Sequence, residues 1–221
     1  MHEQAIAHRP RYHEALVGLE RRIQTMAVMA QHSLEESLDA LARADAAAGD
    51  EVVADDDAID AIYQDIERAT IDLMGRQQPV ASELRFLVGL LHVALHLERI
   101  GDLAVEIAAA TRVPVDLPRR PGVLDRLRDM GTMTAAMTED AVAAFVRRDL
   151  GACEAVAGRG VQVHALDRAL LDDILSAGDD RLPCALETLQ MGRHLERAAE
   201  HAVDIAEQAW FLVTGELREL A

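Results

Sequence analysis

The chain has 221 residues, of which 50 % are hydrophobic and only 3 % are aromatic. Ala, Leu, Val, Ile and Met supply most of the apolar residues, and because Ala and Leu favour helices, the composition indicates an all-α fold. The excess of 39 Asp and Glu over 22 Lys and Arg gives a net charge of −17. A chain this acidic repels phosphate backbones and anionic lipid surfaces, which argues against nucleic-acid binding and direct membrane insertion.

The first half of the chain contains three amphipathic stretches typical of bundle helices. Apolar residues three and four apart predict a first helix over residues 11–43, ended by small residues at 47–50. A second helix follows as far as about Gly75. We expect Pro79 to stand in the first turn of a third helix, which continues to about Thr111.

Three further helices are predicted after a linker rich in helix-breaking residues. The linker residues are Pro114, Pro118, Pro121 and Gly122. The fourth helix continues to a turn at 149–151, and the fifth ends at about Leu175. The sixth follows a break at 176–183 and ends at Thr214, where Gly215 closes it.

The third and sixth helices share sequence at one fixed separation. His96–Arg99 recurs as His194–Arg197, and Ala104–Ala108 recurs with one acidic exchange as Ala202–Ala206, in both cases 98 residues later. A repeat built of helical units is strong evidence for tandem bundles. We therefore predict two three-helix bundles related by an internal repeat, over residues 1–114 and 115–221.

Paired carboxylates mark the two repeated helices. Glu98 and Asp102 are four residues apart, and Glu196 and Glu200 repeat this spacing, so that each pair shares one helix face. Two like charges side by side are unfavourable unless a cation lies between them. Oxygen ligands suit hard cations, and clusters of carboxylates also hold iron or manganese.

Carboxylates on neighbouring helices are placed to complete such sites. The second helix carries Asp56 and Asp60, and the fifth carries Asp167. The alternative is that these residues are solvated helix faces in an acidic protein. The recurrence of the acidic pairs at equivalent positions favours metal binding, more strongly for Glu98 and Asp102 than for the second pair.

The histidines are weaker candidates. His92 and His96 have the four-residue spacing of a metal-binding pair, but on a helix they point away from Glu98. His194 points away from its neighbouring carboxylate in the same way, which indicates packing or a solvated face. His201 follows Glu200 directly and is a marginal candidate.

The sequence carries no motif of a catalytic site or of an exported protein. It lacks GxSxG, a glycine-rich phosphate loop, HExxH and the Glu-x-x-His pattern of di-iron oxidases, so we predict that it is not an enzyme. Cys153 and Cys184 form no CxxC pair and are expected as buried thiols. Residues 1–10 lack the apolar core of a signal peptide, and the apolar run at 86–97 is too short to span a bilayer, which predicts a cytoplasmic protein.

Four segments resemble the PhoU family. Glu98–Asp102 is identical to its ERIGD signature, and Gln78–Arg85 is similar to its QPxAxDLR segment. Leu195–Glu207 resembles LERIGDHAxNIAE, and Trp210–Glu216 resembles the closing aromatic-VTGE stretch. The resemblance covers essentially the whole chain, including the repeat and the linker.

This resemblance implies a cytoplasmic, homodimeric, negative regulator of phosphate uptake and phosphate-starvation signalling. Such proteins act as adaptors to the phosphate ABC transporter ATPase and the phosphate sensor histidine kinase. Their acidic motifs hold metal clusters, with iron favoured and zinc, manganese or magnesium as alternatives. The positions that match these motifs are Asp56, Asp60, Glu98, Asp102, Asp167, Glu196 and Glu200.

Departures from the family pattern concern mainly the second site. Ala198–Glu200 replaces Ile-Gly-Asp, and Val163 falls near the expected counterpart of Asp56. Leu103 stands in place of a usual His, and acidic residues (Glu106, Asp204) stand where Asn is common. Two other hypotheses remain: a carboxylate-bridged metalloenzyme or metal store, and a metal-free helical scaffold.

Overall fold

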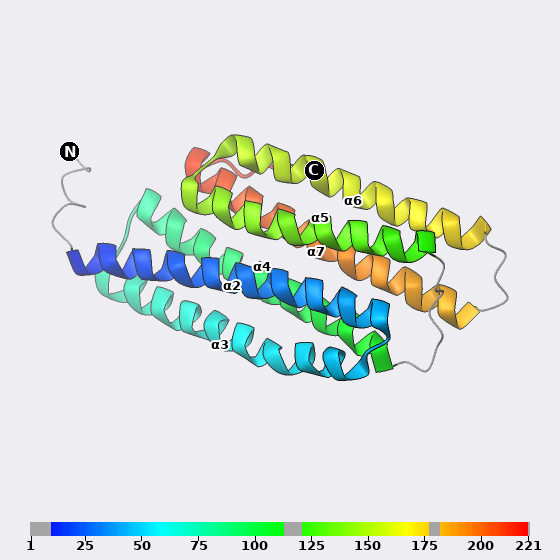
Figure 1. The fold of residues 1–221 in the computed structure, drawn as a ribbon. Helices are drawn as coiled ribbons and strands as arrows, with labels where there is room; N and C mark the ends of the chain where they lie inside the picture. The colour runs from blue at the N-terminus through cyan, green and yellow to red at the C-terminus, as the bar shows by residue number, and fades with distance from the viewer. Residues whose placement is uncertain (1–9, 113–120, 177–181, 221) are drawn as a thin grey trace.

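A computed structural model describes residues 10–112, 121–176 and 182–220 (Figure 1). These residues form six α-helices and one short 3-10 helix, without a β-strand among them. The elements are α2 (Pro10–Arg43), α3 (Ala46–Gln77), α4 (Ser82–Ala109), η1 (Ala110–Arg112), α5 (Pro121–Arg147), α6 (Leu150–Ser176) and α7 (Leu182–Thr214). The predicted all-α fold with three helices in each half of the chain is therefore confirmed.

The breaks around α3 differ from the prediction because capping groups, rather than small residues, set them. The Asp45 carboxylate accepts a hydrogen bond from Ala48 N at 3.1 Å, and Ala44 adopts a φ of 52°. The residues at 47–50, expected as a break, therefore lie inside α3. At the other end, Gln78 adopts a φ of 48° and donates to Met74 O, so that Pro79 precedes α4 instead of lying in its first turn.

The second half repeats the same capping chemistry. Asp149 accepts a hydrogen bond from Ala152 N at 3.1 Å, which starts α6 at Leu150, within the predicted turn. The predicted domain boundary and the linker residues at 113–120 lie outside the described part of the chain, as does most of the break at 176–183. Pro121 and Gly122, predicted as linker, belong to the first turn of α5.

Two three-helix groups lie side by side and share one hydrophobic core (Figure 1). Helices α2, α3 and α4 pack together, as do α5, α6 and α7, while α2 packs on α5 and α4 packs on α7. Between the groups, the rings of Phe86 and Phe145 stack with centroids 5.7 Å apart. A Cβ on Gly131 would lie 1.9 Å from Leu38 Cδ1, so a larger residue at this contact of α2 and α5 would force the Leu38 side chain to move.

In the described part of the chain, no helix combines the length and the apolar character needed to cross a bilayer. This result agrees with the short length of the apolar run at 86–97.

Candidate metal sites

The four acidic residues predicted for the first repeat lie together between α3 and α4. Burial, together with the charges of Asp60 and Asp102, raises the pKa of Asp56 from 3.8 to about 6. Burial and the charge of Asp102 likewise raise the pKa of Glu98, to which Asp60 and Asp56 also contribute. The charges of Asp60 and Asp102 are therefore close enough to Asp56 and Glu98 to oppose the ionisation of these two carboxyl groups.

Gly101 of the acidic motif has a structural role in this site. A Cβ on Gly101 would lie 2.8 Å from Asp56 Oδ1 and 3.1 Å from Ile59 Cδ1. Because glycine has no Cβ, the Asp56 carboxylate can lie directly over the backbone of α4. The motif thus combines two carboxylates on α4 with a gap that admits a third from α3.

The first site has little positive charge of its own. Arg99 lies 2.9 Å from Asp102 Oδ2 and 3.4 Å from Glu98 Oε2, and its side chain is half exposed. Glu98 Oε2 is nevertheless buried without a hydrogen-bond partner. Among the described residues, Asp56 and Asp60 have no ion pair with a basic side chain. A buried carboxylate oxygen that has a 3.4 Å ion-pair contact but no hydrogen bond, next to three further carboxylates, fits a hard cation such as iron, manganese or magnesium.

The capping residues define how the second repeat corresponds to the first. Asp45 and Asp149 cap α3 and α6 and are 104 residues apart. The same separation pairs buried Val52 with Val156, Ile59 with Val163, and Ile66 with Leu170. At this separation, the site residues correspond as follows: Asp56 with Gly160, Asp60 with His164 and Tyr63 with Asp167. Asp167 therefore occupies the position of Tyr63, and Gly160, rather than Val163, occupies the position of Asp56.

Basic side chains neutralise the carboxylates of the second repeat. Arg193 lies 3.1 Å from Asp167 Oδ2 and 2.6 Å from Glu196 Oε2. His164 Nδ1 lies 2.5 Å from Glu196 Oε1. Asp167 is only 2 % exposed, and burial followed by the charge of Glu196 raises its pKa, whereas Arg193 and His164 act in the opposite direction.

A groove of about 470 Å³ lies beside this second site. It is open at Gly160, the position where the first repeat has the Asp56 side chain, and exposed Glu200 stands in its lining. Asp204 and Glu207 line it further along α7. Of the predicted second-repeat residues, Glu196 and Glu200 thus share the groove, while Asp167 lies against Arg193.

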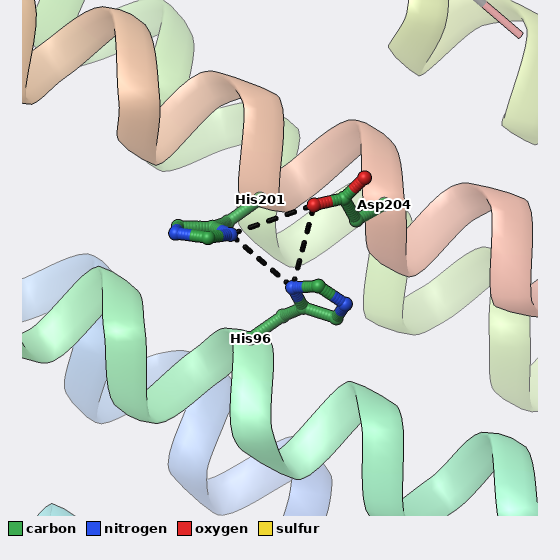
Figure 2. A group of neighbouring side chains, drawn as sticks. All are labelled: His96, His201 and Asp204. Atoms are coloured by element: carbon green, nitrogen blue, oxygen red, sulfur yellow. Dashed lines mark hydrogen bonds and ion pairs between the residues drawn. The ribbon is translucent and has the colours of Figure 1, made fainter. Parts of the chain in front are cut away.

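A third group of potential ligands was not predicted as a site. His96 of α4 and His201 and Asp204 of α7 point toward one another (Figure 2). They form the one group of three such ligands within 4.8 Å of one another that occurs among the described residues. Burial lowers the pKa of His96 to about 4, although Asp204 opposes this shift. The residue spacing correctly placed His96 on a different helix face from Glu98. It gave no indication that His96 faces the other repeat.

Comparisons with known proteins agree with this architecture. The family model described as the PhoU domain matches residues 23–111 and 127–209. The chain is 32 % identical over 217 residues to phosphate-specific transport system accessory protein PhoU homolog 1 of Mycobacterium tuberculosis, covering 93 % of this chain and 94 % of that protein.

Two crystal structures are similar to the whole fold. PhoU from Pseudomonas aeruginosa has a TM-score of 0.85 and 25 % identity, covering 93 % of this chain and 100 % of that chain. The phosphate transport system regulatory protein PhoU from Streptococcus pneumoniae has a TM-score of 0.86 and 26 % identity, covering 94 % and 99 %. The prediction of two PhoU repeats is therefore confirmed.

Proposed function

The chain belongs to the PhoU family, and from this premise we propose that it is a non-enzymatic regulator of phosphate transport. It restrains phosphate uptake and silences the phosphate-starvation response when phosphate is plentiful. The names of its relatives support this role, since they are called accessory or regulatory proteins of the phosphate transport system.

The regulator acts in the cytoplasm as an adaptor, in the form of a homodimer. Its partners are the ATPase of the phosphate ABC transporter and the phosphate sensor histidine kinase. The net charge of −17 supports binding to basic surfaces on such partners, because complementary charge steers association.

The first-repeat site holds metal, iron in the first place, with Asp56, Asp60, Glu98 and Asp102 as ligands. The observation that carries this proposal is the buried Glu98 Oε2 without a hydrogen-bond partner, surrounded by three other carboxylates. A bound cation would cancel their repulsion and fix α3 against α4. The metal therefore stabilises the surface that the adaptor presents.

The second-repeat site is a weaker metal site. Glu196 and Glu200 line an open groove, and His164 adds an imidazole to them. Asp167 contributes only if it exchanges its ion pair with Arg193 for a metal bond. A metal ion at this site has to compete with the basic side chains of Arg193 and His164, which already contact the carboxylates.

Deletion of the gene in its host tests the regulatory role. With abundant phosphate, the deletion strain should show raised phosphate uptake and an active starvation reporter. The wild-type gene should restore repression, and Glu98→Gln/Asp102→Asn should restore it less well. Unchanged uptake and reporter activity in the deletion strain would contradict the proposed function.

Association with the two partners needs a separate measurement. The purified protein should retain the transporter ATPase and the cytoplasmic part of the sensor kinase in pull-downs, and salt should weaken this retention. Retention of neither partner at low salt would contradict the adaptor mechanism. Redox turnover by the iron-loaded protein, without partner binding, would favour the metalloenzyme hypothesis instead.

A further inference from the structure

His96, His201 and Asp204 form a cluster that belongs to neither carboxylate site. His96 comes from the first repeat and the other two residues come from the second, so the cluster joins α4 to α7 (Figure 2). These two helices lie side by side at the junction of the repeats (Figure 1). A ligand bound by all three residues would therefore connect the two halves of the molecule.

The spacing of the three ligand atoms matches a tetrahedral metal ion. The two imidazole Nδ1 atoms are 3.2 Å apart, and Asp204 Oδ2 lies 3.4 Å from His96 Nδ1 and 3.5 Å from His201 Nδ1. A tetrahedral zinc ion with bonds of about 2.0–2.1 Å holds its ligand atoms about 3.3–3.4 Å apart. One ion can therefore bond to all three atoms without movement of either helix.

The chemistry and access of the cluster also suit such an ion. Two imidazoles and one carboxylate are a common ligand set for zinc and related divalent transition metals. The imidazole side chains are 17 % and 21 % exposed, whereas the Asp204 side chain is 43 % exposed. Asp204 also lines the groove of the second repeat, which gives a metal ion a route from solvent.

We propose that His96, His201 and Asp204 form a mononuclear zinc-type site that ties the two repeats together. The three residues supply three ligands, and water from the groove side supplies the fourth. The site differs from the carboxylate sites in its nitrogen ligands and in bridging the repeats. It does not depend on whether the carboxylate sites hold metal.

The residues that correspond to the cluster in the internal repeat do not form a second copy of it. At the separation of 98 residues, His194 corresponds to His96, and Glu106 corresponds to Asp204. Leu103, which is buried, corresponds to His201. The equivalent position therefore lacks one imidazole, and leucine at this place is compatible with the fold.

Zinc titration of the full chain tests the proposal. The background variant Glu98→Gln/Glu196→Gln weakens the carboxylate sites, and it should still bind one zinc ion. Adding His201→Leu should weaken zinc affinity by at least about 100-fold, since even loss of a residue that only supports a ligand costs about 10–100-fold. His92→Ala is the matched control, because His92 is exposed on the same helix and should leave affinity unchanged.

Two further measurements keep the test decisive. Circular dichroism would reveal whether His201→Leu impairs folding. Asp204→Asn changes only a partly exposed side chain, so it should weaken zinc binding without impairing folding. X-ray absorption of the zinc-loaded background variant should show two imidazole ligands. Zinc affinity equal to that of His92→Ala in both variants, or a zinc ion with oxygen ligands only, would overturn the proposal.

Discussion

The two repeats place their carboxylates on the same helical scaffold but neutralise them differently. In both, an Asp caps the helix that carries part of the site, and an acidic pair lies on the helix that follows. The first repeat combines four carboxylates with the half-exposed Arg99. The second replaces Asp56 and Asp60 by Gly160 and His164, and adds Arg193.

From this difference we expect the stronger metal site in the first repeat. Arg193 bridges Asp167 and Glu196 of the second repeat, whereas in the first repeat the described residues give Asp56 and Asp60 no ion pair with a basic side chain. The same fold can therefore contain one site with four carboxylates and a single half-exposed arginine, and one in which Arg193 bridges two carboxylates while Asp167 Oδ1 stays buried without a hydrogen bond.

Removing each arginine should give the largest difference between the repeats. Arg193→Met leaves the buried carboxylates of Asp167 and Glu196 without this cation. Because the Arg193 side chain is 58 % exposed and its charge is screened by solvent, the change should cost about 1–2 kcal/mol of unfolding free energy. Arg99→Met removes an exposed ion pair and should cost less than about 1 kcal/mol. Urea unfolding measures both values.

A second variant identifies the cause of the larger loss. Arg193→Met/Asp167→Asn removes the buried charge together with its partner and should recover part of the lost stability. Equal losses for the two single arginine variants would contradict the contrast between the sites.

The pH dependence of the metal-free protein should identify the first site. Since the pKa of folded Asp56 is about 6, above its ordinary value of 3.8, the folded state binds this proton more tightly. The bound proton on Asp56 therefore contributes fully to the free energy of unfolding below about pH 4, and this contribution is lost as the pH rises through 6. Asp56→Asn stays neutral, so it should match the wild type in acid and exceed it at pH 8 by roughly 1–2 kcal/mol.

Urea unfolding with a chelator at several pH values measures this difference. Saturating metal should reverse the order at pH 8, because only the wild type has the complete ligand set. A stability difference that does not change between pH 4 and pH 8 would mean that Asp56 titrates normally.

The smallest effect on stability is expected at Gly101. In Gly101→Ala, the new Cβ displaces Asp56, while the better helix propensity of alanine offsets the strain, for a net change within about 1 kcal/mol. Metal affinity should fall about tenfold, as when a supporting residue is lost. The repeat-equivalent variant Ala199→Gly is the control and should cost about 1 kcal/mol of stability without this loss. Metal titration and urea unfolding distinguish the two variants, and unchanged affinity in Gly101→Ala would exclude the role of Gly101.

The sequence predicted the helices well because their apolar stripes and breaking residues are local signals. It misplaced the start of the second helix because the decisive features are a side-chain cap at Asp45 and a positive φ at Ala44. The first site could be predicted from the sequence for a similar reason. Glu98 and Asp102 share a helix face by spacing alone, and the structure brings Asp56 and Asp60 to them.

The second site and the histidine cluster depend on information that spacing does not contain. The repeat separation is 98 residues for α4 and α7 but 104 for α3 and α6, so the separation seen in the repeated motifs does not give the equivalent positions on α3 and α6. His96 and His201 meet only because α4 packs on α7 across the repeats. The one sequence signal for this cluster was the exchange of Leu103 for His201 at equivalent positions.

The most direct test of the contrast is elemental analysis of protein purified without chelators or a histidine tag. All variants carry His201→Leu, so that the histidine cluster does not contribute metal. The parent should contain stoichiometric metal, Glu98→Gln/Asp102→Asn should lose most of it, and Glu196→Gln/Glu200→Gln should keep most of it. Metal at background level in the parent, or a loss confined to the second-repeat variant, would contradict the assignment of the first repeat as the principal metal site.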